Sequence, residues 1–284
     1  MSTTVPAQRQ NRMPTVESEM VPRPEYRHPD WRPSGLLEGR VAVVTGGDSG
    51  IGRAVAYLYA NEGADVVIGY LSEHRDARET AQAIEELGRR CVLVPGDLSH
   101  SQDAGRLVSE AMRVKSRIDV FVQNAAVQYD AADFADASVE SIERTVTVNL
   151  LGALYALHAA LPSMRAGSSA IVTTSVTAYR GSTHLADYAA TKGGLAALVY
   201  SLAGQQAARG IRVNGVAPGP VWTPLIAGSS PEEQVRGFGK DTPMGRAAQP
   251  WEIAPSYLFL ASERWSGYVT GQVVHPNGGE AVNA

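Results

Sequence analysis

The sequence is poor in several residue types, and each shortage argues against a class of protein. Its single cysteine, Cys91, rules out a disulfide within the chain and suits a reducing compartment. Only three lysines occur, at positions 115, 192 and 240, and the formal net charge is −4 with no dense Lys/Arg run. We therefore expect no binding to nucleic acid.

Long hydrophobic runs and metal-ligand patterns are also missing. The N-terminus has no apolar signal core, and the longest apolar stretch, 149–161, is short and interrupted by Asn149 and His158. We expect a cytoplasmic protein with no membrane partner. The six histidines show no ligand spacing, so no metal is expected, and Cys91 reads as a buried strand thiol rather than a nucleophile.

What is present predicts one α/β domain. Apolar residues make up 44% of the 284 residues and charged residues 19%, enough for a sizeable core. Short apolar runs alternate with helical stretches, which indicates a single Rossmann-type, doubly wound parallel seven-stranded sheet with helices on both faces. The runs are 41–44, 66–68, 91–94, 120–122, 170–172, 211–216 and 273–274, and the main helices 75–88, 101–114, 138–164, 187–208 and 251–262.

Residues 1–36 differ from the domain that we place at 37–284. They hold six of the sixteen prolines and show no periodicity, so they cannot order themselves alone. This extension is either a floppy tail or an arm that docks on a neighbouring subunit through Tyr26 and Trp31, because aromatic residues are unusual in a pure linker.

A glycine-rich turn follows the first apolar run. It reads Thr45-Gly-Gly-Asp-Ser-Gly-Ile-Gly52 and leads directly into a helical stretch. Strand, glycine turn and helix in this order favour a dinucleotide site, since the glycines let the backbone approach the pyrophosphate at the helix N-terminus. The spacing is Gly46-x-x-x-Gly50-x-Gly52, and its structural alternative is an ordinary turn.

Tyr188 and Lys192 lie four residues apart, with Ser175 upstream. Positions i and i+4 share one face of a helix, and a lysine held there lowers the pKa of a phenol from its usual value of about 10. By composition such a Tyr/Lys pair arises by chance only about 0.1 times in this chain. A surface lysine beside a packed aromatic is the alternative.

With these motifs, the chain resembles the short-chain dehydrogenase/reductase family across residues 37–284. Further matches in the family's order are Gly96-Asp97-Leu98, Asn124-Ala125-Ala126, Val148-Asn149 and Pro218-Gly219. Segments such as 71–74, 217–224 and 243–246 resemble the bacterial aldehyde-reductase and glucose-dehydrogenase-like members that carry an N-terminal extension.

The resemblance implies four catalytic residues. Tyr188 is the general acid/base, Lys192 lowers its pKa and binds the nicotinamide ribose, and Ser175 hydrogen-bonds the substrate oxygen. Asn149 would hold a water that relays the proton. Taken singly, Ser175 could be a strand-end hydroxyl and Asn149 a residue that caps or kinks its helix.

The cofactor contacts that we expect come from loops that follow the strands. Asp97 would accept from the adenine amino group, Asn124 would tie neighbouring strands together, and Thr223 would bind the carboxamide. Ala126 departs from the family's usual glycine. The full set is Gly46, Asp48, Ser49, Gly50, Ile51, Gly52, Tyr70, Asp97, Leu98, Asn124, Ala125, Tyr188, Lys192, Pro218, Gly219, Val221 and Thr223.

Cofactor choice depends on the end of the second strand. An acidic group there would bind the ribose diol and repel a 2′-phosphate, but the chain has Tyr70-Leu71-Ser72 at this point. Ser49 stands where NADP-selective relatives often carry a basic residue. The sequence favours NADP(H), with NAD(H) use possible.

These observations predict an NAD(P)-dependent oxidoreductase acting on a carbonyl/alcohol pair, with NADPH-dependent reduction of aldehydes or small ketones first. Alternatives are a glucose-like sugar dehydrogenase, a 3-oxoacyl thioester reductase with Arg180 as a docking residue, and a non-catalytic dinucleotide-binding protein. Residues 222–249 suit a lid, with further substrate contacts from Thr177, Tyr179 and His184. The resemblance also implies a homotetramer.

Overall fold

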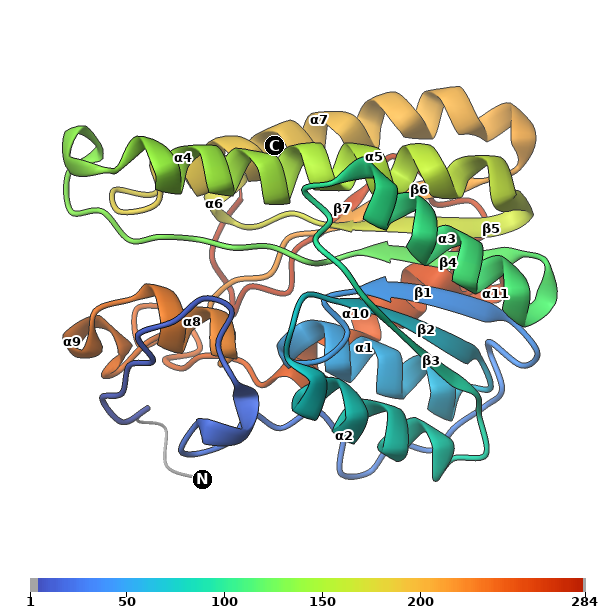
Figure 1. The fold of residues 1–284 in the computed structure, drawn as a ribbon, viewed down its shortest axis with the longest axis horizontal. Helices are drawn as coiled ribbons and strands as arrows, with labels where there is room; N and C mark the ends of the chain where they lie inside the picture. The colour runs from blue at the N-terminus through green and yellow to red at the C-terminus, as the bar shows by residue number, and fades with distance from the viewer. Residues whose placement is uncertain (1–4, 283–284) are drawn as a thin grey trace.

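The centre of the fold is one parallel sheet of seven strands in the order β3-β2-β1-β4-β5-β6-β7 (Figure 1). The structure, a computed structural model, describes residues 5–282. Strand order reverses between β1 and β4, and ligands bind in the crevice at the carboxyl ends beside such a reversal. The predicted sheet is confirmed. Its strands are β1 Val41–Thr45, β2 Asp65–Tyr70, β3 Cys91–Pro95, β4 Ile118–Gln123, β5 Met164–Thr173, β6 Arg212–Val216 and β7 Val273–Val274.

Helices cover both faces of the sheet, as Figure 1 shows. One face carries α1 Gly50–Asn61, α2 His74–Glu85 and α10 Pro250–Ala261, and the other carries α3 Ser101–Lys115, α5 Gly152–Ala160 and α7 Ala186–Gln206. Successive residues of a strand point to opposite faces, so Val43 packs with the second group while Ala42 and Val44 pack with the first. The remaining helices are α4 Val139–Val146, α6 Thr177–Arg180, α8 Pro224–Ser229, α9 Glu232–Val235 and α11 Glu263–Ser266.

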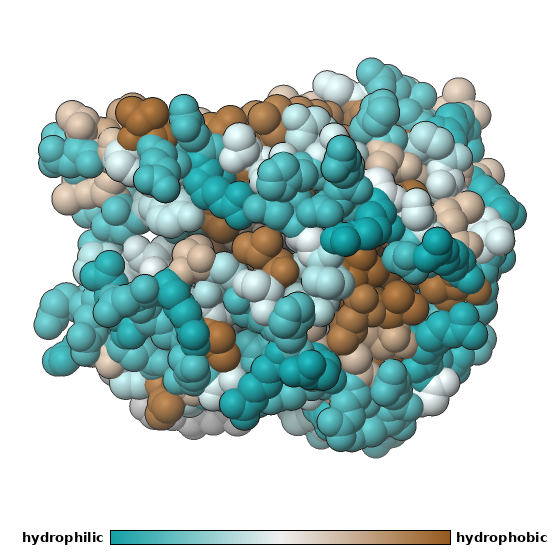
Figure 2. Space-filling view, in the orientation of Figure 1, coloured by the Kyte–Doolittle hydropathy of each residue, from teal (hydrophilic) through white to brown (hydrophobic). Residues whose placement is uncertain are grey.

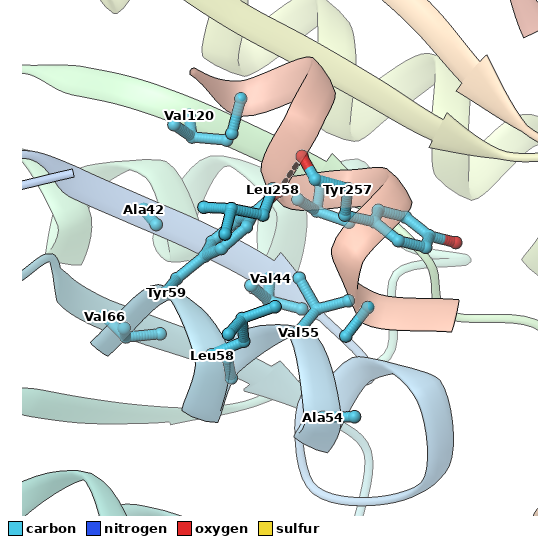
Figure 3. Close-up of a cluster of buried hydrophobic side chains, with 14 of the residues drawn as sticks. Ala42, Val44, Ala54, Val55, Leu58, Tyr59, Val66, Val120, Tyr257 and Leu258 are labelled. Atoms are coloured by element: carbon cyan, nitrogen blue, oxygen red, sulfur yellow. Dashed lines mark hydrogen bonds between the residues drawn. The ribbon is translucent and has the colours of Figure 1, made fainter. Parts of the chain in front are cut away.

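The core between β1, α1 and α10 is apolar and contains one hydrogen-bonded pair of tyrosines. Figure 3 shows Val44 and Val120 of the sheet beside Leu58 of α1 and Leu258 of α10. The hydroxyl of Tyr59 donates to the carbonyl oxygen of Tyr257 at 3.0 Å. Because this buried phenol has a backbone partner, the contact fixes α1 against α10 without leaving its hydroxyl unpaired.

The predicted helix 138–164 is present but interrupted. It runs as α4, a π-helical turn at Thr147–Leu151, α5 and a 3-10 turn, and its last predicted residue, Met164, begins β5. The segment Val139–Ser163, of mean hydropathy 1.3, is long and apolar enough to cross a membrane by length and composition alone. Half of that window is buried, and α5 packs on α3, as expected of a core helix.

The N-terminal segment, residues 5–36, packs on its own chain rather than extending as a tail. The ring of Tyr26 meets that of Tyr57 edge-on at 5.4 Å, and the indole nitrogen of Trp31 donates to Glu62 at 2.7 Å. Figure 1 shows the dark blue segment beside α8 and α9 before it passes under α1 and α2. Docking on a neighbouring subunit through these aromatics stays a prediction.

Candidate active site

The glycine turn has the geometry that the motif predicts. Gly46 and Gly50 adopt φ values of 63° and 52°, in the left-handed region that favours glycine. A Cβ added to Gly52 would lie 1.9 Å from the carbonyl oxygen of Gly46. The missing side chain therefore lets α1 start directly against the end of β1, with the first N–H groups of the helix beside the turn.

A cavity lies at the carboxyl ends of the strands, beside the reversal in strand order. In Figure 2 the face is hollowed at the left, between α4 and the N-terminal segment with α8. Of the predicted cofactor contacts, eleven line this cavity: Gly46, Asp48, Ser49, Gly50, Ile51, Tyr70, Asp97, Leu98, Asn124, Ala125 and Thr223. In open parallel sheets a dinucleotide binds in this crevice, beside the point where the strand order reverses.

The other six predicted cofactor contacts do not line the cavity, and four of them make backbone contacts in the loops around it. Val221 pairs with Ala248 in an isolated bridge, and Pro218 accepts a hydrogen bond from Val176 N–H at 3.2 Å. A Cβ at Gly219 would lie 2.7 Å from the Cα of Asn277. Gly52, Val221, Pro218 and Gly219 therefore act through backbone packing, while Tyr188 and Lys192 are not among the residues that line the cavity.

Asp97 is held in place by Arg144 of α4. One carboxylate oxygen accepts from Ser99 N–H at 2.9 Å, and the other accepts from the Arg144 guanidinium at 2.8 Å. Desolvation raises the pKa of Asp97, but the Ser99 and Arg144 hydrogen bonds outweigh it, so the net shift is downward. An ionised acceptor suits the adenine contact expected of Asp97, although the turn that it makes with Ser99 is the structural alternative.

Asn124 ties strands together as expected. Its amide nitrogen donates to the carbonyls of Thr45 and Gly46 at 3.1 and 3.3 Å, and its oxygen accepts from Thr173 at 3.4 Å. Asn124 thereby joins the ends of β4, β1 and β5 beside the glycine turn. Ala126, which replaces a glycine of the family pattern, lines the cavity with its neighbours.

The end of β2 differs from the expectation. The sequence predicted no acidic group there, but Asp48 from the glycine turn and Glu73 both line the cavity with Tyr70. Burial, with a smaller contribution from the charge of Glu73, raises the pKa of Asp48 to about 7. Folding thus brings the carboxyl of Asp48, 22 positions away along the chain, near Tyr70 at the end of β2.

Ser175, Tyr188 and Lys192 come together at the ends of β5 and α7. All three are buried, and Lys192 Nζ donates to the Thr173 carbonyl at 2.8 Å. The Ser175 hydroxyl accepts from the N–H and hydroxyl of Thr177 at 3.2 and 3.0 Å, which leaves its own hydrogen to donate. This places a serine donor, a phenol and an ammonium group at one point.

The charges of this cluster differ from the expectation. Burial raises the pKa of Tyr188 to about 12, although its hydrogen bond with Ser175 lowers it, and burial lowers the pKa of Lys192 to about 7. The predicted lowering of the Tyr188 pKa by Lys192 is therefore not what this structure shows. Desolvation decides both shifts, because each ionised form would lose its hydration.

Asn149 lies in the π-helical turn and clamps the loop after β4. Its side chain is fully buried, accepting from Val127 N–H at 2.8 Å and donating to Val127 carbonyl oxygen at 2.8 Å. Its nitrogen also lies 3.3 Å from the Thr191 hydroxyl. The π turn aims this amide at the loop, as such turns often do at functional sites.

Several cavity residues were not predicted from the sequence. Arg144 and Val148 come from the α4 region, and Met13, Pro14 and Thr15 come from the N-terminal segment. A single arginine on a helix, or a Met-Pro-Thr in a Pro-rich segment, carries no motif. Only their packing on the glycine turn and α8 identifies them.

The remaining expectations concern Cys91 and metals. Cys91 lies in β3 as a free thiol, and burial raises its pKa to about 12, which leaves it protonated and weakly nucleophilic. Among residues 5–282, no three or more His, Cys, Asp or Glu side chains are grouped so as to hold a metal ion.

Comparisons with known proteins agree with this geometry. A family model described as enoyl-(acyl carrier protein) reductase matches residues 46–280. The chain is 46% identical over 283 residues to NADPH-dependent aldehyde reductase 1, chloroplastic, of Arabidopsis thaliana, covering 98% of each chain. It is 44% identical over 284 residues to glucose and ribitol dehydrogenase of Daucus carota, covering 98% of this chain and 97% of the other.

A solved structure gives the same fold. The short chain dehydrogenase from Burkholderia cenocepacia in complex with NADP superposes with a TM-score of 0.79 at 28% identity, covering 86% of this chain and 98% of that one. Fold, motif order and whole-length similarity lead to one conclusion: this chain belongs to the short-chain dehydrogenase/reductase family and is an oxidoreductase.

Proposed function

We propose that the protein reduces aldehydes or small ketones with NADPH, and that Asn149, Ser175, Tyr188 and Lys192 carry the reaction. One observation supports this above the others: the Ser175, Tyr188 and Lys192 side chains converge at the end of β5. There Thr173 accepts from Lys192 and donates to Asn124, which lines the cavity with the glycine turn. The aldehyde reductase of Arabidopsis thaliana and the NADP complex of the Burkholderia cenocepacia enzyme support the choice of cofactor and substrate.

Each side chain has a separate role in this proposal. When bound, NADPH supplies the hydride. The Ser175 hydroxyl donates to the carbonyl oxygen, and Tyr188 gives that oxygen its proton as negative charge develops. Because Tyr188 has a raised pKa in this structure, it is protonated at neutral pH and ready to act as the acid in the reducing direction.

Lys192 and Asn149 support this proton transfer. The ammonium nitrogen of Lys192 lies 5.4 Å from the centre of the Tyr188 ring. When Tyr188 has given up its proton, the charged amine would stabilise the phenolate. Both groups of the Asn149 amide already bind Val127, so we assign it the positioning of that loop, with the oxygen's second lone pair left for the relay water.

The predicted cofactor contacts divide into two groups. We propose that the eleven residues lining the cavity contact NADPH, with Asp97 at the adenine and Thr223 at the carboxamide. Thr223 precedes Pro224 at the start of α8, where the expected lid begins. We keep Lys192 at the nicotinamide ribose, and Gly52, Pro218, Gly219 and Val221 as backbone that shapes the walls.

The alternatives differ in support. Sugar oxidation with NAD(P) is second, because the dehydrogenase of Daucus carota is nearly as similar as the aldehyde reductase. A thioester reductase that docks an acidic carrier through Arg180 is disfavoured, since this guanidinium lies 3.4 Å from the carboxylate of Glu280. Glu280 offsets the charge of Arg180, which weakens the case for this residue as a docking site for an acidic carrier.

We also propose a cytoplasmic homotetramer that binds neither nucleic acid nor membranes. The net charge of −4 supports the first absence. On α5 and α7, Leu154 is 38% exposed and Tyr200 is 52% exposed, and a chain that covers them would remove this apolar surface from water. Sedimentation of the purified protein tests the tetramer.

The test of function is the oxidation of NADPH and NADH by purified protein with a panel of aldehydes and ketones. We expect turnover with NADPH that falls about 10²–10⁴-fold in Tyr188→Phe, while NADPH binding by the variant persists. No turnover with any carbonyl, but reduction of NAD(P) by glucose-like sugars, would replace the proposal with the second function. Turnover unaffected by Tyr188→Phe would refute the assigned acid.

A further inference from the structure

We propose that the N-terminal segment forms part of the cofactor site, with Thr15 closing its wall and Glu17 positioning the glycine turn. The inference rests on the proposed function, since it assigns residues to the same NADP(H) site. It goes beyond a docking arm, because an arm that only stabilised the fold would not need to reach the dinucleotide cavity.

Thr15 joins the segment to the first turn of α8 at the mouth of the cavity. Its hydroxyl donates to the Pro224 carbonyl at 2.6 Å, and both residues line the cavity. A Cβ at Gly228 would lie 2.3 Å from the Thr15 methyl group, so α8 has a glycine where the segment crosses it. The cavity wall is therefore built jointly by the segment and α8.

Glu17 reaches the other side of the cavity. Its side chain is fully buried, and one carboxylate oxygen accepts from Gly50 N–H at 2.6 Å, at the first residue of α1. The other oxygen pairs with the guanidinium of Arg53, which also donates to the Asp48 carbonyl at 2.9 Å. Glu17 thus holds the glycine turn at both ends, directly at Gly50 and through Arg53 at Asp48.

Burying the Glu17 carboxylate costs desolvation free energy, which a segment that only stabilised the fold could avoid by using apolar contacts. Burial raises the pKa of Glu17, and the charge of Arg53 and the Gly50 hydrogen bond oppose that shift. Arg53 is itself 1% exposed, so without Glu17 the guanidinium loses its nearest counter-charge, Asp76 lying 3.9 Å away. The pair is consistent with a requirement for a fixed glycine turn rather than for stability alone.

The segment also holds the expected lid. Met20 packs in a buried cluster with Trp222, Ile226 and Val235, and the Trp222 indole donates to the Pro22 carbonyl at 2.8 Å. Since α8 and the segment share both this cluster and the Thr15 bond, we expect them to open together when cofactor leaves. Loosening the segment should therefore speed NADPH release as well as weaken binding.

The experiment compares two cavity variants, Thr15→Val and Glu17→Gln, with a control elsewhere on the segment. Among residues 5–282, the Glu25 side chain accepts only from the Trp251 indole, at 3.3 Å and away from the cavity lining, so Glu25→Ala removes a contact of the segment while the Met20 cluster, Thr15 and Glu17 keep theirs. NADPH affinity and release rate are measured by cofactor fluorescence and stopped flow, well below each variant's Tm, and kcat is taken at saturating cofactor.

We expect Thr15→Val and Glu17→Gln to weaken NADPH binding about tenfold, mainly by faster release, with kcat changed less than about twofold. Thr15→Ser should recover most of the affinity, because it restores the hydroxyl. Glu25→Ala should bind NADPH as the wild type does. If Thr15→Val and Glu17→Gln lower the Tm but leave NADPH binding unchanged, the segment only stabilises the fold and the inference is wrong.

The two proposals fail in different ways. A wild-type protein that binds neither NADPH nor NADP⁺ refutes the proposed function before any variant is compared. If Glu17→Gln does not fold, Thr15→Val decides the inference alone, since its hydrogen bond is to a backbone carbonyl and carries no buried charge.

Discussion

The ammonium nitrogen of Lys192 lies 5.4 Å from the centre of the Tyr188 ring, one turn along α7. Its hydrogen bond goes to the carbonyl of Thr173 at the end of β5, whose hydroxyl meets that of Tyr257 at 2.7 Å. The lysine is thus fixed to the sheet independently of the phenol. This arrangement orients a buried amine toward the site without a carboxylate to neutralise it.

Lys192→Met separates the effect of the amine on catalysis from the free energy that burying its charge costs the fold. We expect kcat to fall at least about 10²-fold, because the phenolate of Tyr188 loses its cationic neighbour. Burial lowers the pKa of Lys192 from 10.5 to about 7, so the charged amine destabilises the fold below pH 7, and this cost fades as pH rises toward 10.5. In thermal unfolding, the Tm of Lys192→Met should exceed that of the wild type at pH 6, and this difference should shrink by pH 9.5. A variant less stable than wild type at pH 6 would mean that the Thr173 hydrogen bond outweighs desolvation.

Asp48→Asn should weaken the pH dependence of the free energy of unfolding. The pKa of Asp48 is raised from 3.8 to about 7, so the folded protein keeps a proton that the unfolded chain releases. The free energy of unfolding therefore falls as pH rises from about 4 to 7, and this decline should be smaller in the variant.

The same substitution bears on cofactor choice. Above pH 7 the wild-type carboxylate repels the 2′-phosphate of NADPH, so Asp48→Asn should improve NADPH binding more at pH 8 than at pH 6. Binding of NADH, which lacks this phosphate, is the control. Equal gains for both cofactors at both pH values would contradict the placement of Asp48 at the 2′ position.

Asn149→Ala tests whether the clamp on Val127 matters. The substitution leaves the buried N–H and carbonyl of Val127 without their partners, at a cost of about 1–3 kcal/mol for each group. We expect a lower Tm by calorimetry together with a loss of kcat. Loss of kcat with an unchanged Tm would instead assign Asn149 to the proton relay alone.

Two glycine substitutions should have opposite effects. Gly52→Ala puts a Cβ against the Gly46 carbonyl, so we expect loss of NADPH binding and a lower Tm. Gly105→Ala, in the middle of α3 with nothing within 4 Å of the added Cβ, should raise stability by up to about 1 kcal/mol. Denaturant unfolding measures both. Equal destabilisation would show that the Gly46 contact is not what constrains position 52.

The sequence predicted the elements near the site because their signals are local. Buried parallel strands read as apolar runs, and the glycine turn and the Tyr188/Lys192 pair each need fixed residue types within a few positions. The seven strands and the main helices were confirmed on this basis. The break at Asn149 was not expected as a π turn, since one extra residue in a helix leaves no clear change in periodicity.

What only the tertiary structure decided is where distant charges and the N-terminal segment lie. Asp48 and Glu73 line the same cavity although they are 25 positions apart along the chain. Glu17 likewise reaches Gly50, which is 33 positions away. The direction of the Tyr188 pKa shift was misjudged for the same reason. Spacing along a helix identifies which groups are neighbours, but burial sets the cost of their charges, and burial is a property of the whole fold.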